Sequence, residues 1–165
     1  MPRTLLLRPT SNLANMPLAH LRAARDEDRV PIRALLHANS LPTSDLEAAR
    51  PLFVVACMDR QIVGTGALQS FGSVALLRSI AVEPHLRGAG VGRAIVRELE
   101  HLARTSEIRQ LILLTQTARS FFEAQGYVAI DRSRAPPAVQ ESEEFRSLCP
   151  ASALCMSKAL SLPGT

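Results

Sequence analysis

The sequence of 165 residues contains no tryptophan, one tyrosine, five phenylalanines and a single lysine, Lys158. With so few aromatic side chains it lacks the stacking surface typical of proteins that bind single-stranded nucleic acid. Its net charge of +4 comes from arginines that are scattered among acidic residues rather than gathered in a run. We therefore expect no nucleic-acid partner and favour a small anionic ligand, because the arginine fork fits phosphate and carboxylate groups.

Cysteine and histidine are also scarce. The three cysteines, Cys57, Cys149 and Cys155, are too few for a disulfide framework, and neither they nor the four histidines have the spacing of a zinc site. We expect no metal and a reducing, cytoplasmic location. No apolar run approaches the roughly 18 residues that a membrane-spanning helix needs, so we expect no membrane partner either.

The length suits one domain, which we place at residues 19–160, after a loose leader at 1–18 and before a tail at 161–165. The hydrophobic pattern and the turn residues predict the following elements. Helices are expected at 26–38, 45–49, 91–105 and 118–125, strands at 20–25, 53–58, 62–68, 74–82, 110–115, 127–130 and 153–160, and a polar loop at 131–144. This order predicts an α/β (α+β) fold with a mixed, mostly antiparallel sheet flanked by helices.

The stretch Arg87–Gly92, RGAGVG, follows an apolar run and opens a helical pattern. A dinucleotide-binding turn needs G-x-G-x-x-G at the first strand, and a P-loop needs G-K-[ST]; this stretch has neither spacing. Free backbone amides at a helix start, with glycines that let a ligand approach, favour a bound pyrophosphate. Arg87 would add a charged donor beside it. The alternative is a glycine-rich turn without a ligand.

Two stretches together resemble the Gcn5-related N-acetyltransferases (GNAT). Ser79–Gly92 is similar to motif A of that family, an apolar strand followed by V-x-P and [RQ]-x-x-G-x-[GA], and Ala118–Tyr127 is similar to its later motif A-x-x-[FL]-[YF]-x-x-x-G-[FY]. The resemblance implies the fold and acetyl-CoA as cosubstrate, held by main-chain amides and by a strand edge that pairs with the pantetheine arm. The implied cofactor-binding residues are Ile80, Ala81, Val82, Arg87, Gly88, Ala89, Gly90, Val91, Gly92 and Phe122.

The sequence resembles one branch of this family more closely than the others. Ser142–Ala153, Leu76–Ser79 and Leu113–Thr115 are similar to the arsenic-resistance N-acetyltransferases, which are related to amino-acid acetyltransferases such as N-acetylglutamate synthase. This resemblance implies a small, carboxylated amine as acceptor: an amino acid, a glutamate-like compound or an organoarsenical. Further candidates for the acceptor site are Thr115 and Thr117, near the end of a predicted strand.

Arg78 is the first candidate for binding the acceptor carboxylate. It lies two residues before Ile80 on the predicted central strand, so we expect both side chains on the same side of the sheet. The alternative is an ordinary surface charge at a strand edge. Strands that face a cleft are usually apolar, which gives this alternative equal weight.

The acid and the base of the reaction are harder to assign. Many members of the family have a tyrosine that protonates the leaving thiolate, and Phe122 stands at that position here. Tyr127 falls where the family packs a core residue. Glu83 and His85, at the end of the central strand, are candidate bases. Thr115, Thr117 and Ser120 are candidate acids. A solvated loop residue and a helix cap are the respective alternatives.

The sequence thus predicts an acetyl-CoA-dependent N-acetyltransferase in which the acceptor amine attacks directly within a ternary complex. A protein N-terminus or a polyamine is the alternative acceptor. A polyamine site calls for clustered acids, and the one such run, Glu141–Glu144, is interpreted as a loop. A coenzyme-A-binding module without turnover is the other alternative, favoured by the missing tyrosine. A homodimer is one expectation, because dimers are common in this family.

Overall fold

A computed structural model describes residues 19–161, so the expected leader and residues 162–165 lie outside the described part. Within it, a seven-stranded sheet has the order β1-β2-β3-β4-β5-β7-β6, and all neighbours are antiparallel except β4 and β5. The expected mixed, mostly antiparallel sheet is confirmed. The strands are β1 His20–Ala23, β2 Leu52–Met58, β3 Gln61–Phe71, β4 Val74–Val82, β5 Gln110–Thr115, β6 Val128–Ile130 and β7 Leu154–Ala159.

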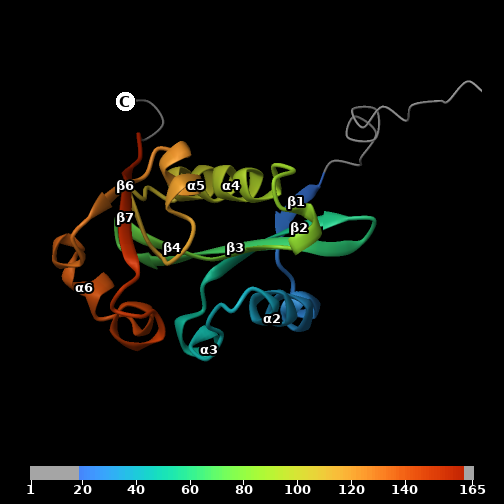
Figure 1. Cartoon of the computed structure of the whole chain (residues 1–165), viewed down its shortest axis with the longest axis horizontal. Helices are drawn as coiled ribbons and strands as arrows, with labels where there is room; N and C mark the ends of the chain where they lie inside the picture. Colours follow the sequence, from blue (N-terminus) through green and yellow to red (C-terminus); the bar gives the residue numbers. More distant parts are fainter. Residues whose placement is uncertain (1–18, 162–165) are drawn as a thin grey trace, which may run out of the picture.

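Helices cover both faces of this sheet (Figure 1). α4 (Val91–Thr105) and α5 (Arg119–Ala124) lie on one face, and α2 (Arg29–Ala38) and α3 (Leu46–Ala49) on the other. α4 packs on the sheet because apolar residues recur at helical spacing along one side of it. The buried residues of that side are Val91, Ile95, Val96, Leu99 and Ala103.

The region 131–144 contains helical turns, so the prediction of a plain loop there is wrong. A 3₁₀ turn at Arg132–Arg134 and α6 (Pro137–Gln140) precede a π-helical turn at Glu144–Leu148. These pieces are too short to show a hydrophobic period in the sequence. Val139 and Phe145 nevertheless hold them on the sheet, because both are buried against side chains of β4 and β5.

The two parallel strands separate along their length. β4 pairs with β5 only at Val74–Leu76, opposite Gln110–Ile112, although both strands continue beyond this point. From Leu77 onward, the main-chain groups of β4 that point toward β5 have no partner on that strand. The sheet therefore opens into a cleft at its centre.

A β-bulge lies on β4 beside this cleft. Arg78 pairs with Ala67 and Ala81 with Thr65, so Ser79 and Ile80 together stand opposite Gly66. The extra residue reverses the alternation of side chains, and Ser79 has a φ of 58°. Arg78 therefore reaches the α3 side of the sheet, where it meets Asp45, whereas Ile80 packs with the core under α4. The expectation that Arg78 and Ile80 face the same side is wrong.

The absence of a side chain at Gly66 allows α4 to approach the bulge. A Cβ atom at this position would lie 2.6 Å from Ile80 Cδ1, 2.6 Å from Ile95 Cγ2 and 2.9 Å from Leu99 Cδ1. We predict that Gly66→Ala lowers the free energy of unfolding by about 1–3 kcal/mol, because the core must shift to accept the methyl group. Denaturant unfolding followed by circular dichroism measures this.

Gly92→Ala is the matched control. A Cβ atom there would meet Phe121 Cζ at an ordinary 3.5 Å, and the residue lies in the first turn of α4. We expect this variant to be as stable as the wild type or up to about 1 kcal/mol more stable, because alanine is the better helix former. Equal stability of Gly66→Ala and the wild type would contradict the close approach of α4 to β3.

Candidate active site

The cleft between β4 and β5 continues into a cavity of about 790 Å³, a volume typical of small-molecule sites. Its lining comes from four segments. They are the loop Asn39–Pro42 after α2, residues between Leu77 and Arg93, residues between Leu113 and Gln125, and residues between Glu144 and Ala153. One cavity therefore connects the glycine-rich loop at the start of α4 with the C-terminal part of the chain.

The glycine-rich loop leaves a group of amides unpaired. Gly88 and Gly90 have φ values of 84° and 90°, a conformation that favours glycine. The first helical bond of α4 runs from the Ala94 amide to the Gly90 carbonyl at 3.0 Å, so the amides of Val91–Arg93 lack a backbone partner among the described residues. Such a helix start attracts an anion.

Not every amide of the predicted cradle is available. The Arg87 amide donates to the Pro84 carbonyl at 3.3 Å, and the Ala89 amide donates to the Leu86 carbonyl at 3.2 Å. The Arg87 side chain donates to Asn39 Oδ1. The free amides are therefore those of Gly88 and of residues 90–93, one residue further into α4 than predicted. That this loop binds a pyrophosphate stays a prediction.

The other predicted cofactor residues divide between the cleft and the core. Ile80 and Val82 line the cavity, on the edge of β4 that β5 leaves unpaired. The side chain of Ala81 turns to the opposite face and is buried beneath α2. Phe122 reaches the cavity but is only 6% exposed, and it packs edge-on against Tyr127. The expected core position of Tyr127 is confirmed, because this side chain is 1% exposed.

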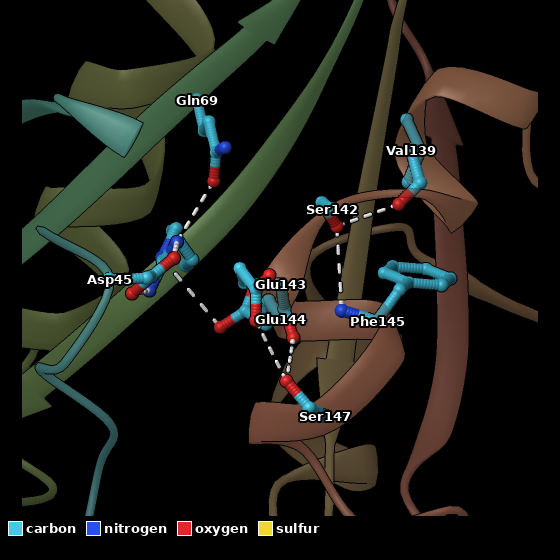
Figure 2. Close-up of polar contacts among 9 residues, drawn as sticks. Asp45, Gln69, Val139, Ser142, Glu143, Glu144, Phe145 and Ser147 are labelled. Atoms are coloured by element: carbon cyan, nitrogen blue, oxygen red, sulfur yellow. Dashed lines mark hydrogen bonds and ion pairs between the residues drawn. The ribbon is translucent and has the colours of Figure 1, made fainter. Parts of the chain in front are cut away.

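Arg78 lies in the cavity lining with its guanidinium engaged by protein groups. Nη1 donates to Asp45 Oδ2 at 2.6 Å and to Gln69 Oε1 at 2.8 Å, and Nη2 donates to Asp45 Oδ1 at 2.7 Å. Figure 2 shows Asp45 and Gln69 approaching this position from different elements. Both terminal nitrogens of Arg78 are thus engaged by protein groups, and its predicted role in binding an acceptor carboxylate stays a prediction.

Glu144 is the cavity residue that sequence reasoning missed. It is 6% exposed, and its Oε1 lies 3.7 Å from Arg78 Nε, too far for a hydrogen bond. Arg78 Nε and Glu144 Oε2 are both buried without a hydrogen-bond partner among the described residues. Burial raises the pKa of Glu144 to about 7, with the Arg78 charge opposing the shift and the Asp45 charge adding to it.

Of the remaining predicted site residues, two line the cavity and two do not. Thr115 and Thr117 line the cavity, and Thr115 Oγ1 accepts a hydrogen bond from the Ala118 amide at 3.0 Å, as a helix cap does. Glu83 is half-buried and Ser120 is exposed, and neither lines the cavity. Their expected catalytic roles stay predictions without a place in the cavity.

Residues 19–161 contain neither a cluster of metal ligands nor a membrane-spanning helix. No group of three or more histidine, cysteine, aspartate or glutamate side chains in this range is arranged to hold a metal ion. None of the helices formed by these residues combines the length and apolar character needed to cross a membrane.

Comparison with known proteins agrees with this geometry. Residues 49–129 match the family described as acetyltransferase (GNAT) domain. The amino-acid acetyltransferase of Mycobacterium tuberculosis (strain ATCC 25618 / H37Rv) is 35% identical over 72 residues, which are 43% of this chain and 41% of that protein. The match thus spans less than half the length of this curated relative.

Two solved structures are similar over most of the chain. N-acetylglutamate synthase from Neisseria gonorrhoeae, complexed with coenzyme A and N-acetyl-glutamate, has a TM-score of 0.76 at 19% identity, over 88% of this chain and 36% of that one. Rv2747 from Mycobacterium tuberculosis, in complex with CoA and NLQ, has a TM-score of 0.74 at 26% identity, over 86% of this chain and 99% of that one.

The family match covers two of the four segments that line the cavity, whereas residues 39–42 and 144–153 lie outside it. Residues 49–129 include β2 through β5, the cleft, the glycine-rich loop and both helices of one face. The two solved structures extend the similarity to 88% and 86% of the chain. We conclude that residues 49–129 lie in an acetyltransferase (GNAT) domain.

Proposed function

We propose that the protein is an N-acetyltransferase that moves an acetyl group from acetyl-CoA to the primary amine of a small acceptor. The observation that carries this proposal is one continuous cavity of about 790 Å³. It joins the unpaired amides at the start of α4 to the buried charged groups of Arg78 and Glu144. A ligand pair with an anionic end at the loop and an amine at the other end fits this distribution.

Acetyl-CoA would be held mainly by the backbone. The amides of Gly88 and of residues 90–93 would bind its pyrophosphate. The unpaired edge of β4 at Ile80 and Val82 would hydrogen-bond to the pantetheine arm as a neighbouring strand does, and an amide there would stabilise the oxyanion that forms on the thioester. The coenzyme A bound in the solved N-acetylglutamate synthase and Rv2747 structures supports this arrangement.

The acceptor would be a small carboxylated amine. The amino-acid acetyltransferase relative and the N-acetyl-glutamate in the solved synthase support an amino acid or a glutamate-like compound. An organoarsenical acceptor rests on the resemblance of the sequence alone. Thr115 and Thr117 would contribute hydroxyl groups from the β5 side, and the unpaired Nε of Arg78 a charged donor from the β4 side.

We predict that the protein releases free thiol from acetyl-CoA only when a suitable acceptor is present. The panel would contain the common amino acids, glutamate analogues, an amino-bearing organoarsenical, a polyamine and a peptide with a free N-terminus. Thiol release would be followed colorimetrically, and the acetylated product by mass spectrometry. Release that depends on a small amino acid is the expected result, because the buried end of the cavity suits a compact amine.

Two other results of this assay would change the acceptor or overturn the proposed reaction. Release with the polyamine or the peptide alone would replace the proposed acceptor while keeping the reaction. Tight binding of coenzyme A without thiol release from any acceptor would overturn the proposal, and the protein would then be a binding module without turnover.

A charge placed at the start of α4 tests the binding of the pyrophosphate. We predict that Gly92→Glu weakens the binding of coenzyme A by at least about tenfold, because the new carboxylate lies in the cavity lining and repels the phosphates. Gly92 is a cleaner position than Gly90, where a φ of 90° would strain any side chain. Isothermal titration calorimetry measures the affinity, and circular dichroism checks the fold.

Arg97→Glu is the control for this variant. Arg97 is exposed on the same helix and does not line the cavity, yet its replacement changes the net charge by more than Gly92→Glu does. We expect affinity close to that of the wild type. Unchanged affinity in Gly92→Glu would remove the start of α4 from the binding site.

A further inference from the structure

On the basis of the proposed function, we infer that Glu144 accepts the proton that the amine of the acceptor must lose before it attacks. Nothing in the sequence comparison assigns this residue a role, and it lies outside the region that matches the family. Four features support the assignment: the composition of the cavity lining, the direction of the side chain, the charges around it and its unpaired oxygen.

The lining offers few groups that can take up a proton. Among the described residues that line the cavity, the titratable side chains are those of Arg78, Arg87, Arg93, Cys149 and Glu144. Arginine stays protonated in proteins. Burial raises the pKa of Cys149 to about 11, and the nearby Glu144 charge adds to the shift, so this thiol keeps its proton near neutral pH. Glu144 is therefore the lining side chain suited to accept a proton at neutral pH.

The π-helical turn directs Glu144 into the cavity. Ser142 holds the turn, because its hydroxyl donates to the Val139 carbonyl at 2.6 Å and accepts from the Phe145 amide at 3.4 Å. Glu143 points the other way and accepts a hydrogen bond from Ser147 Oγ at 2.9 Å (Figure 2). Neighbouring glutamates thus have opposite surroundings, one exposed and one buried. π-helical turns of this kind are frequent at functional sites.

The charges around Glu144 come from three elements. Arg78 of β4 is its nearest cation, Asp45 before α3 is paired with that arginine, and Cys149 follows the π-helical turn. Since Asp45 already neutralises Arg78 through two hydrogen bonds, an ionised Glu144 leaves the cluster with one excess negative charge. That charge attracts an ammonium group, and the unpaired Oε2 provides an acceptor for its N–H.

The pKa of about 7 suits this task, because a base works best when its pKa lies close to the pH at which the reaction runs. The carboxylate of Glu144 takes one proton from the acceptor ammonium and later releases it to solvent. The free amine forms the N–C bond to the acetyl carbon and the C–S bond breaks. The second proton of the nitrogen ends on the leaving sulfur. One acetamide, one thiol and one released proton are the products.

Glu144→Gln and Glu143→Gln form a matched pair that tests the inference. The acceptor is the amino acid that gives thiol release with the wild type, and kcat/KM is measured from pH 5.5 to pH 9.5. We expect a rise of the wild-type kcat/KM with pH along a limb near pH 7. Glu144→Gln should lower kcat/KM at pH 7 by about 10²- to 10⁴-fold, lose this limb and recover as the pH approaches the pKa of the acceptor amine itself.

The control and the contrary outcomes separate the two proposals. Glu143→Gln should keep the wild-type profile, and both variants should keep the wild-type affinity for coenzyme A. A Glu144→Gln protein with the wild-type limb, or with kcat/KM within threefold of the wild type at pH 7, would overturn the role of Glu144 and leave the proposed function intact. A wild type that releases no thiol with any acceptor would overturn both.

A second readout does not depend on turnover. The folded protein holds a proton on Glu144 between its ordinary pKa of 4.5 and about pH 7, where the unfolded chain does not. This group therefore destabilises the folded protein as the pH rises across that interval: the unfolding equilibrium constant increases by up to about tenfold for each unit of pH. We expect Glu144→Gln to lose this dependence and Glu143→Gln to keep it. Identical pH dependence in the wild type and Glu144→Gln would show that Glu144 has an ordinary pKa.

Discussion

Three pairs of residues join β4 to β5, and the strands then separate while both continue. Hydrogen bonds of a parallel ladder end there, so the backbone of β4 beyond Leu76 has unpaired groups directed at the cleft. The cavity, the strand edge proposed for pantetheine and the position of the glycine-rich loop all depend on this separation. A regular parallel pair along the whole of β4 would close the site.

The bulge at Ser79 and Ile80 determines to which face of the sheet the neighbouring side chains of β4 point. One additional residue on β4 sends Ile80 toward α4 and Arg78 toward Asp45 on the other face. Without it, an arginine and an apolar side chain would share one side of the strand. With it, the buried cation becomes part of a polar cluster that Glu144 joins from the C-terminal segment. The bulge thus separates the apolar packing of the core from the charged end of the cavity.

Much of the fold could be predicted because its elements have clear local patterns. The apolar spacing of α4 and the buried runs of β4 and β5 indicate their structure within a few residues. The loop Arg87–Gly92 could be identified for a similar reason, since glycines with left-handed φ values and a helix start are local features. The short turns around Val139 and Phe145 could not be predicted, because their stability comes from contacts with the sheet rather than from their own sequence.

The amino-acid sequence by itself determined the class of fold and the position of the glycine-rich loop, since both depend on residues that lie close together in the chain. Only the tertiary structure decided the partners of Arg78 and the burial of Glu144. Asp45 and Glu144 are far from Arg78 in sequence, and burial, to which the Asp45 charge adds, raises the pKa of Glu144. The charge state of such a group depends on the solvent that the fold excludes, which neighbouring residues in the chain do not reveal.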